Sequence, residues 1–206
     1  MTNPNKTHLL TIVDRSGSMS YVAADMRGGL DTFFKEQSEL DGECLVDYVQ
    51  FDTEYEKVFE DTPVADAKAV LVPRGGTALL DAIGKGVTEL GEKFAHLDED
   101  SRPGTVLVVV VTDGEENSSR EWSADTVKAL IKQQEDEWGW KFTFLGANID
   151  AVAVGAQFGF AADSSLTYST ANIGQTMSSL NTYVGTTRSG LKGVYSDEDR
   201  NNAVNP

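Results

Sequence analysis

The segment from Thr105 to Thr112 (TVLVVVVT) constrains the fold of this chain more than any other. It is apolar without interruption from 106 to 111, and every residue in it except Leu107 is β-branched. A strand buried on one face only alternates apolar with polar residues, and this run has no polar face. We therefore expect a central strand of a parallel sheet that ends where Asp113 and Gly114 begin a loop.

The rest of the chain alternates between strand and helix patterns. We expect further strands at 8–13, 44–51, 55–59, 141–147 and 164–168, and helices at 21–39, 77–94, 123–138, 150–158 and 173–184. The short turn at Asp52 and Thr53 joins two of these strands into a hairpin, so the strand at 55–59 should be antiparallel. Segment 64–71 is ambiguous and could form a short helical piece.

This order of elements predicts an α/β fold. We expect a doubly wound, mostly parallel central sheet with one antiparallel edge strand and helices on both faces. A chain of 206 residues suits one domain, which we place at residues 1–190. Residues 191–206 are polar and irregular, so we expect them to form a loose C-terminal tail.

Charge and cysteine content limit the classes of partner. The chain has 33 acidic against 17 basic residues, a net charge of −16, which disfavours binding to nucleic acid or anionic membranes. Cys44 is the single cysteine and lies in an apolar run, so we expect a buried structural thiol and a reducing compartment. The N-terminus has no signal-peptide pattern, and the longest apolar run is too short to span a bilayer. We therefore expect a cytoplasmic protein.

Three polar segments should meet at one edge of the sheet. Asp14-Arg15-Ser16-Gly17-Ser18 leaves the end of the strand at 8–13, and Asp113 leaves the end of the central strand. Gly75-Gly76-Thr77 is a glycine-rich loop directly before a helix, and it can reach that edge from the side. Ligands of open α/β sheets bind at the carboxyl ends of the strands.

The residue types at this edge suit a hard cation. Two carboxylates and three hydroxyls offer only oxygen, which favours Mg²⁺, with Mn²⁺ or Ca²⁺ as alternatives, over metals that prefer thiolates. In a tight turn, alternate residues such as Asp14, Ser16 and Ser18 can point the same way, and Gly17 permits the sharp backbone. Taken singly, the serines and the threonine could equally be ordinary turn and helix-capping residues.

These residues resemble the metal-ion-dependent adhesion site (MIDAS) of von Willebrand factor A domains. That motif is Asp-x-Ser-x-Ser, then a separate Thr, then a separate Asp usually followed by Gly. The sequence supplies Asp14, Ser16, Ser18, Thr77 and Asp113 in this order, and the order of strands and helices matches over about residues 6–188. The resemblance is to the small intracellular type found in bacteria and phages.

The resemblance implies a role for each residue. Ser16 and Ser18 would coordinate the metal directly, and Thr77 would do so directly or through water. Asp14 and Asp113 would mainly orient bound waters and balance charge. One coordination position would stay open for an Asp or Glu carboxylate of a partner protein. The implied function is a divalent-metal-dependent protein-binding module and not an enzyme; the oligomeric state is left open.

Four charged residues lie beside the motif. Glu115 and Glu116 follow Asp113 and could tune the site, although a solvated acidic loop is the simpler expectation. Arg15 and Arg74 could lie at the rim and grip a partner carboxylate, although ordinary surface arginines are the simpler expectation.

Two other functions are open from sequence. One is a metal-assisted hydrolase or phosphatase that uses the same acidic edge, but no nucleophile elbow surrounds Ser16 or Ser18 and no phosphate-binding loop motif is present. His8 lies in a predicted strand and His96 in a polar loop, so neither is placed as a ligand or a general base. The other is an acidic charge mimic that inhibits a partner without metal.

Overall fold

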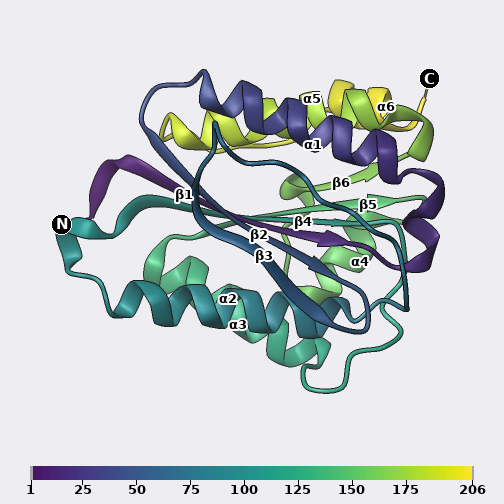
Figure 1. Ribbon diagram of the computed structural model, residues 1–206, viewed down its shortest axis with the longest axis horizontal. Coiled ribbons are helices and arrows are strands. Elements are labelled where there is room, and N and C mark those ends of the chain that lie inside the picture. Colours follow the sequence, from purple (N-terminus) through teal and green to yellow (C-terminus); the bar gives the residue numbers. More distant parts are fainter. Residues whose placement is uncertain (1, 206) are drawn as a thin grey trace.

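The apolar segment singled out above is a central strand of one sheet. The computed structural model describes residues 2–205, and over these residues six strands pair in the order β3-β2-β1-β4-β5-β6 (Figure 1). They span Asn3–Asp14 (β1), Glu43–Phe51 (β2), Tyr55–Pro63 (β3), Pro103–Thr112 (β4), Lys141–Ala147 (β5) and Ser165–Tyr168 (β6). All neighbours are parallel except β2 and β3.

Helices cover both faces of this sheet. They span Ala23–Ser38 (α1), Leu79–Ala95 (α2), Ala124–Trp138 (α3), Ala151–Phe158 (α4), Ile173–Arg188 (α5) and Asp197–Val204 (α6). Figure 1 shows α1, α5 and α6 on one face and α2, α3 and α4 on the other. The doubly wound, mostly parallel sheet with one antiparallel edge strand is confirmed. None of the helices within residues 2–205 has the length and apolar character needed to cross a membrane.

Alternate residues of each central strand enter two separate cores. In β1, Leu9 and Val13 pack with α1 and α5, whereas Leu10 and Ile12 pack with α2 and α3. The valines of β4 divide in the same way, and all five are buried. This explains the uninterrupted apolar run, because a strand with helices on both faces has no side for polar residues.

Local capping agrees with several predicted boundaries. The Ser123 side chain accepts a hydrogen bond from the backbone N–H of Thr126 at the start of α3. Gly159 ends α4 with a φ of 102°, in the left-handed region that glycine adopts without steric cost.

The helical piece considered for segment 64–71 is absent. The chain runs there without regular structure from the end of β3 towards α2. Val64, Ala67 and Leu71 are nevertheless buried and join the core on the α1 face. Their spacing resembles a helix face, but contact with the rest of the protein decides their conformation. β1 and β3 are also longer than predicted.

The expectation of a loose C-terminal tail is wrong. Tyr195 is buried, stacks on Tyr183 with 4.9 Å between ring centroids, and its hydroxyl lies 2.7 Å from Thr143 Oγ1. Ser196 then begins α6 with a capping box closed by Asp199. Because α6 is mostly polar, its sequence does not show that the buried Tyr195 just before it anchors this segment.

Candidate functional site

The five residues of the motif lie at the topological switch point of the sheet, between β1 and β4. From β1 the chain passes through α1 to β2 on one side, and later through α2 to β4 on the other. Such a switch leaves a crevice at the carboxyl ends of the two central strands. Asp14 is the last residue of β1, and Asp113 directly follows β4.

Asp14 anchors the site. It is fully buried, and both carboxylate oxygens are held: Oδ1 accepts the backbone N–H of Ser16 at 2.6 Å, and Oδ2 accepts the hydroxyl of Thr112 at 2.6 Å. These bonds join the loop after β1 to the end of β4. Thr112 is a part of the site that the motif does not contain, although its place next to Asp113 in a parallel strand would have indicated it.

A chain of hydroxyls leads from Asp14 to Asp113. Ser16 Oγ lies 2.9 Å from Ser18 Oγ, and Ser18 Oγ donates to Asp113 Oδ1 at 2.7 Å. Adjacent ligands of a hard cation with bonds of about 2.1 Å lie roughly 3 Å apart, so these separations suit one shared ion. Ser16 is buried and Ser18 is exposed, so the row of oxygens reaches from the protein interior to solvent.

Thr77 reaches the same place from the loop before α2. It is buried, its backbone N–H donates to Asn117 Oδ1 at 3.0 Å, and its carbonyl accepts the N–H groups of Asn117 and Ser118. A Cβ atom placed on Gly114 would lie 3.4 Å from Thr77 Oγ1 and 3.7 Å from Ser18 Oγ. The hydroxyls of Thr77 and Ser18 therefore border one small space, and the structure brings all five motif residues together.

The glycines before Thr77 allow this close approach. Gly75 has a φ of 68° and its carbonyl accepts the N–H of Gly17 at 3.1 Å. A Cβ on Gly76 would lie 2.5 Å from Ser118 Oγ, closer than two such atoms approach. The hydrogen bond between Gly17 and Gly75 therefore holds the loops of Ser16 and Thr77 together, and a side chain at position 76 would obstruct the contact with the loop after β4.

Glu116 is not part of a solvated acidic loop. Its carboxylate accepts the N–H of Leu80 at 2.9 Å in the first turn of α2 and also binds the backbone of Ser118 and Ser119. A carboxylate at a helix N-terminus satisfies free N–H groups and the helix dipole. Glu116 thus fixes the loop after Asp113 to the helix after Thr77, while Glu115 is exposed.

Arg15 is neither a rim residue nor an ordinary surface arginine. It is buried, and its guanidinium pairs with Asp52 at 2.9 Å and with Glu56. The Arg74 side chain is exposed. It pairs with the same Asp52 carboxylate at 2.6 Å and also with Glu54. These ion pairs tie the β2–β3 turn to the site loops. Burial raises the pKa of Asp52, but the hydrogen bond from Arg74 and the charges of both arginines lower it overall.

The two carboxylates of the site have no such partner. Within residues 2–205 neither Asp14 nor Asp113 forms an ion pair with Lys or Arg, and burial raises the pKa of both, that of Asp14 to about 6. The negative charge of Asp113 adds to the shift of Asp14. Tyr168 of β6 is buried near them, and its hydroxyl has no hydrogen-bond partner among the described residues.

A divalent ion fits the residues present. The donors are all oxygen, their separations suit adjacent ligands, and the two carboxylates have no cationic partner in the described chain. His8, Asp47 and Asp61 form another group that could hold a metal, but it lies beside the middle of β1 and is separate from this site.

Comparisons with known proteins identify the fold. No protein-family model matches the sequence, and no curated protein matches it. Solved structures do match. The von Willebrand factor domain of the type V pili tip protein Mfa5 from Porphyromonas gingivalis has a TM-score of 0.63 at 10% identity, covering 93% of this chain and 98% of that one. A von Willebrand factor type A protein from Catenulispora acidiphila has a TM-score of 0.59 at 18% identity, covering 86% and 42%.

A third structure adds a bound metal. Proximal thread matrix protein 1 from the mussel byssus, solved with a zinc-occupied MIDAS motif, has a TM-score of 0.59 at 16% identity and covers 85% of this chain and 44% of that one. This chain therefore has the von Willebrand factor A fold, and it spans less than half the length of the mussel and Catenulispora chains.

Proposed function

We propose that this chain, with its von Willebrand factor A fold, is a protein-binding module whose MIDAS-type metal ion accepts a carboxylate from a partner protein. The observation that carries the proposal is the hydroxyl chain from Ser16 through Ser18 to Asp113, anchored on buried Asp14 and open to solvent at Ser18. A divalent ion held there by mostly neutral hydroxyls would keep enough positive charge to attract an external Asp or Glu.

Mg²⁺ is the metal we propose. The donor set of Asp14, Ser16, Ser18, Thr77 and Asp113 contains no nitrogen or sulfur, so it favours a hard cation, with Mn²⁺ and Ca²⁺ as alternatives. The zinc in the mussel byssus protein means that Zn²⁺ belongs in any test.

The surface beside the site supports contact with a protein. Tyr21 ends the short 3₁₀ helix Gly17–Tyr21 that carries Ser18, and it is 95% exposed. Exposed tyrosines often contribute much of the binding energy of an interface. Mfa5 is described as a pilus tip protein and PilB from Streptococcus sanguinis as a minor pilin, which is compatible with a protein partner here. A cytoplasmic location remains a prediction from the sequence.

We propose binding and not catalysis as the activity. The groups around the site are hydroxyls, carboxylates and backbone amides, and both histidines lie elsewhere, His8 in β1 and His96 at the end of α2. Hydrolysis usually requires a general base within reach of the substrate, and Asp14 is fully buried with both oxygens in hydrogen bonds. Metal-dependent turnover of p-nitrophenyl phosphate that Asp14→Asn abolishes would instead support the hydrolase.

Affinity capture from the native host with the purified chain as bait tests the proposal. We expect a partner that is retained in Mg²⁺, released by EDTA, and lost with Ser18→Ala. Ser20→Ala is the matched control, because Ser20 lies on the same 3₁₀ helix and its hydroxyl donates to the carbonyl of Gly17. Retention that is unaffected by EDTA but weakened by salt would contradict the proposal and favour the acidic mimic.

A further inference from the structure

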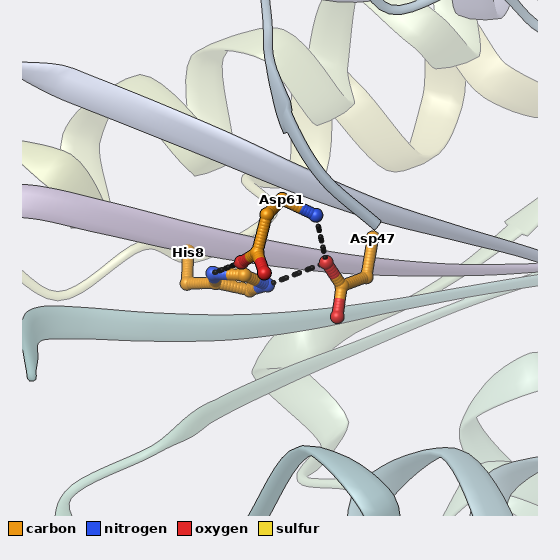
Figure 2. A group of neighbouring side chains, drawn as sticks. All are labelled: His8, Asp47 and Asp61. Carbon is orange, nitrogen blue, oxygen red and sulfur yellow. Dashed lines mark hydrogen bonds and ion pairs between the residues drawn. The ribbon is translucent and has the colours of Figure 1, made fainter. Parts of the chain in front are cut away.

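A second polar cluster is centred on His8, near the middle of the strand that ends at Asp14. His8 of β1 is 1% exposed and points to the α2 face of the sheet, where its ring meets Phe94 edge-on at 5.1 Å. Asp47 comes from β2 and Asp61 from β3, so three adjacent strands each contribute one side chain. Figure 2 shows the two carboxylates gathered around the imidazole.

A β-bulge produces this arrangement. The pairing of β2 with β3 shifts between Val46 and Tyr48, so Asp47 lies within the irregularity. On the opposite strand Asp61 has a φ of 47°, and its backbone N–H donates to Asp47 Oδ1 at 2.7 Å. The bulge thus turns the Asp61 carboxylate towards His8, as Figure 2 shows.

The imidazole nitrogen nearest Asp47 makes no hydrogen bond. His8 Nε2 lies 3.0 Å from Asp47 Oδ1, yet it has no hydrogen-bond partner among the described residues. A nitrogen and an oxygen that both bind zinc at about 2.0–2.1 Å lie roughly 3.0–3.4 Å apart. One ligand atom from each of His8, Asp47 and Asp61 can be chosen so that all lie within 4.8 Å of one another.

A cation already occupies part of the cluster. Lys93 Nζ lies 3.2 Å from Asp47 Oδ2 and 2.7 Å from Asp61 Oδ1, so the ammonium group bridges the two carboxylates. Its side chain is 24% exposed, and it lines a cleft of about 200 Å³ between β3 and α2 together with Asp47 and Glu89. The cleft therefore gives solvent access to Lys93 and to the Asp47 carboxylate that it contacts.

We propose that His8, Asp47 and Asp61 form a second divalent metal site, for a transition metal such as Zn²⁺, which displaces the ammonium of Lys93. An imidazole nitrogen with two carboxylates suits zinc better than magnesium. The ion would join β1, β2 and β3 at the antiparallel edge of the sheet. This site is independent of the MIDAS-type site, because Asp14 lies six positions after His8 along β1, a distance of about 20 Å in a strand.

Zinc titration of the EDTA-treated chain, read from the ring nitrogens of histidine by NMR, tests the proposal. The chain has two histidines, and His96 ends α2 outside the cluster, so it is an internal control. We expect Zn²⁺ to shift the Nε2 resonance of His8 and leave His96 unchanged, while Mg²⁺ moves neither.

Two conservative variants separate a metal site from a structural ion network. Asp61→Asn keeps the backbone N–H and tolerates the left-handed φ, and we expect it to weaken zinc binding at His8 at least tenfold. Asp66→Asn, at an exposed position, is its control. Lys93→Met removes the competing ammonium, so zinc binding should be unchanged or tighter. Absence of a zinc-dependent His8 shift in the wild type, or an equal affinity in Asp61→Asn, would overturn the proposal.

Discussion

Two buried carboxylates lie in opposite electrostatic surroundings, Asp14 at the carboxyl end of β1 and Asp47 on β2 opposite Leu10. At the carboxyl end, Asp14 meets hydroxyls, backbone amides and a second carboxylate, and its pKa rises to about 6. Beside the middle of β1, burial raises the pKa of Asp47 on β2, but the nearby imidazole of His8, the N–H of Asp61 and the charge of Lys93 lower it to about 2. Both carboxylates are almost fully buried.

Burial alone therefore does not distinguish a binding site from a structural ion pair. Asp47 has a basic partner within the chain, and Asp14 has none among the described residues. A buried carboxylate without a cation costs free energy, which a bound metal can recover. Asp14 therefore has the stronger demand for an external cation, whereas at the cluster of His8, Asp47 and Asp61 a metal must displace Lys93.

We expect the largest change in stability from a substitution at Asp47, which tests whether its charge is compensated within the chain. Asp47→Asn keeps an acceptor for the N–H of Asp61 but leaves Lys93 without its buried partner. We expect the metal-free protein to lose about 2–4 kcal/mol of unfolding free energy at pH 7. Urea unfolding measures this, with Glu43→Gln on the exposed start of β2 as the control. A loss below about 0.5 kcal/mol would remove the contrast.

Asp14→Asn should raise the unfolding free energy, whereas Asp47→Asn should lower it. The Asn carbonyl can accept the N–H of Ser16, and its amide can donate to Thr112 Oγ1, which itself can donate to the carbonyl of Gly114. Because the wild-type carboxylate is unfavourable when buried, we expect the metal-free variant to be more stable at pH 7, by on the order of 2–3 kcal/mol. A destabilised variant would show that the charge of Asp14 is compensated within the chain.

The wild type should show the matching pH dependence. The pKa of Asp14 in the folded state, about 6, lies above the ordinary value of 3.8, so the folded protein binds the proton more tightly. This contribution to stability is complete below pH 3.8 and is lost as the pH rises through 6. Urea unfolding of wild type and Asp14→Asn in EDTA between pH 5 and 7.5 isolates this contribution. If the unfolding free energies of both proteins changed equally with pH, the raised pKa of Asp14 would be contradicted.

The smallest effect concerns the scaffold of the site. Glu116→Ala removes the carboxylate that accepts the N–H of Leu80 at the start of α2. We expect a loss of about 1 kcal/mol in unfolding free energy, the usual cost of an N-terminal cap. Glu116→Gln keeps an acceptor but loses the charge, so it should fall between the two. Equal stability of all three proteins would show that Glu116 does not hold the loop.

Much of this architecture is readable from sequence because single elements carry strong local signals. The run from Thr105 to Thr112 has one physical solution, a strand covered on both faces, and the parallel sheet follows from it. Asp14 and Asp113 come directly after such strands, so topology alone brings them to one edge. Thr77 was placed there through the resemblance and the glycines before it.

The remaining features depend on contacts between distant segments. Glu116 caps a helix that begins 37 residues before it, and no local pattern indicates that pairing. Arg15 is buried because Asp52 and Glu56 face it from the β2–β3 hairpin. His8 looked like an isolated strand residue because its partners come from two other strands and from a bulge that the sequence does not mark. The position of α6 similarly depends on Tyr195, whose contacts with Tyr183 and Thr143 no local pattern indicates.

Calorimetric titration of Mg²⁺ into the EDTA-treated chain tests the central claim most directly. We expect one ion per chain in the wild type, and at least tenfold weaker binding in Ser18→Ala and Asp113→Ala, whose side chains make the 2.7 Å contact at the open end of the site. Ser20→Ala and Asp61→Asn should bind Mg²⁺ like the wild type. Absence of Mg²⁺ binding, or an affinity that Ser18→Ala and Asp113→Ala leave unchanged, would contradict the account.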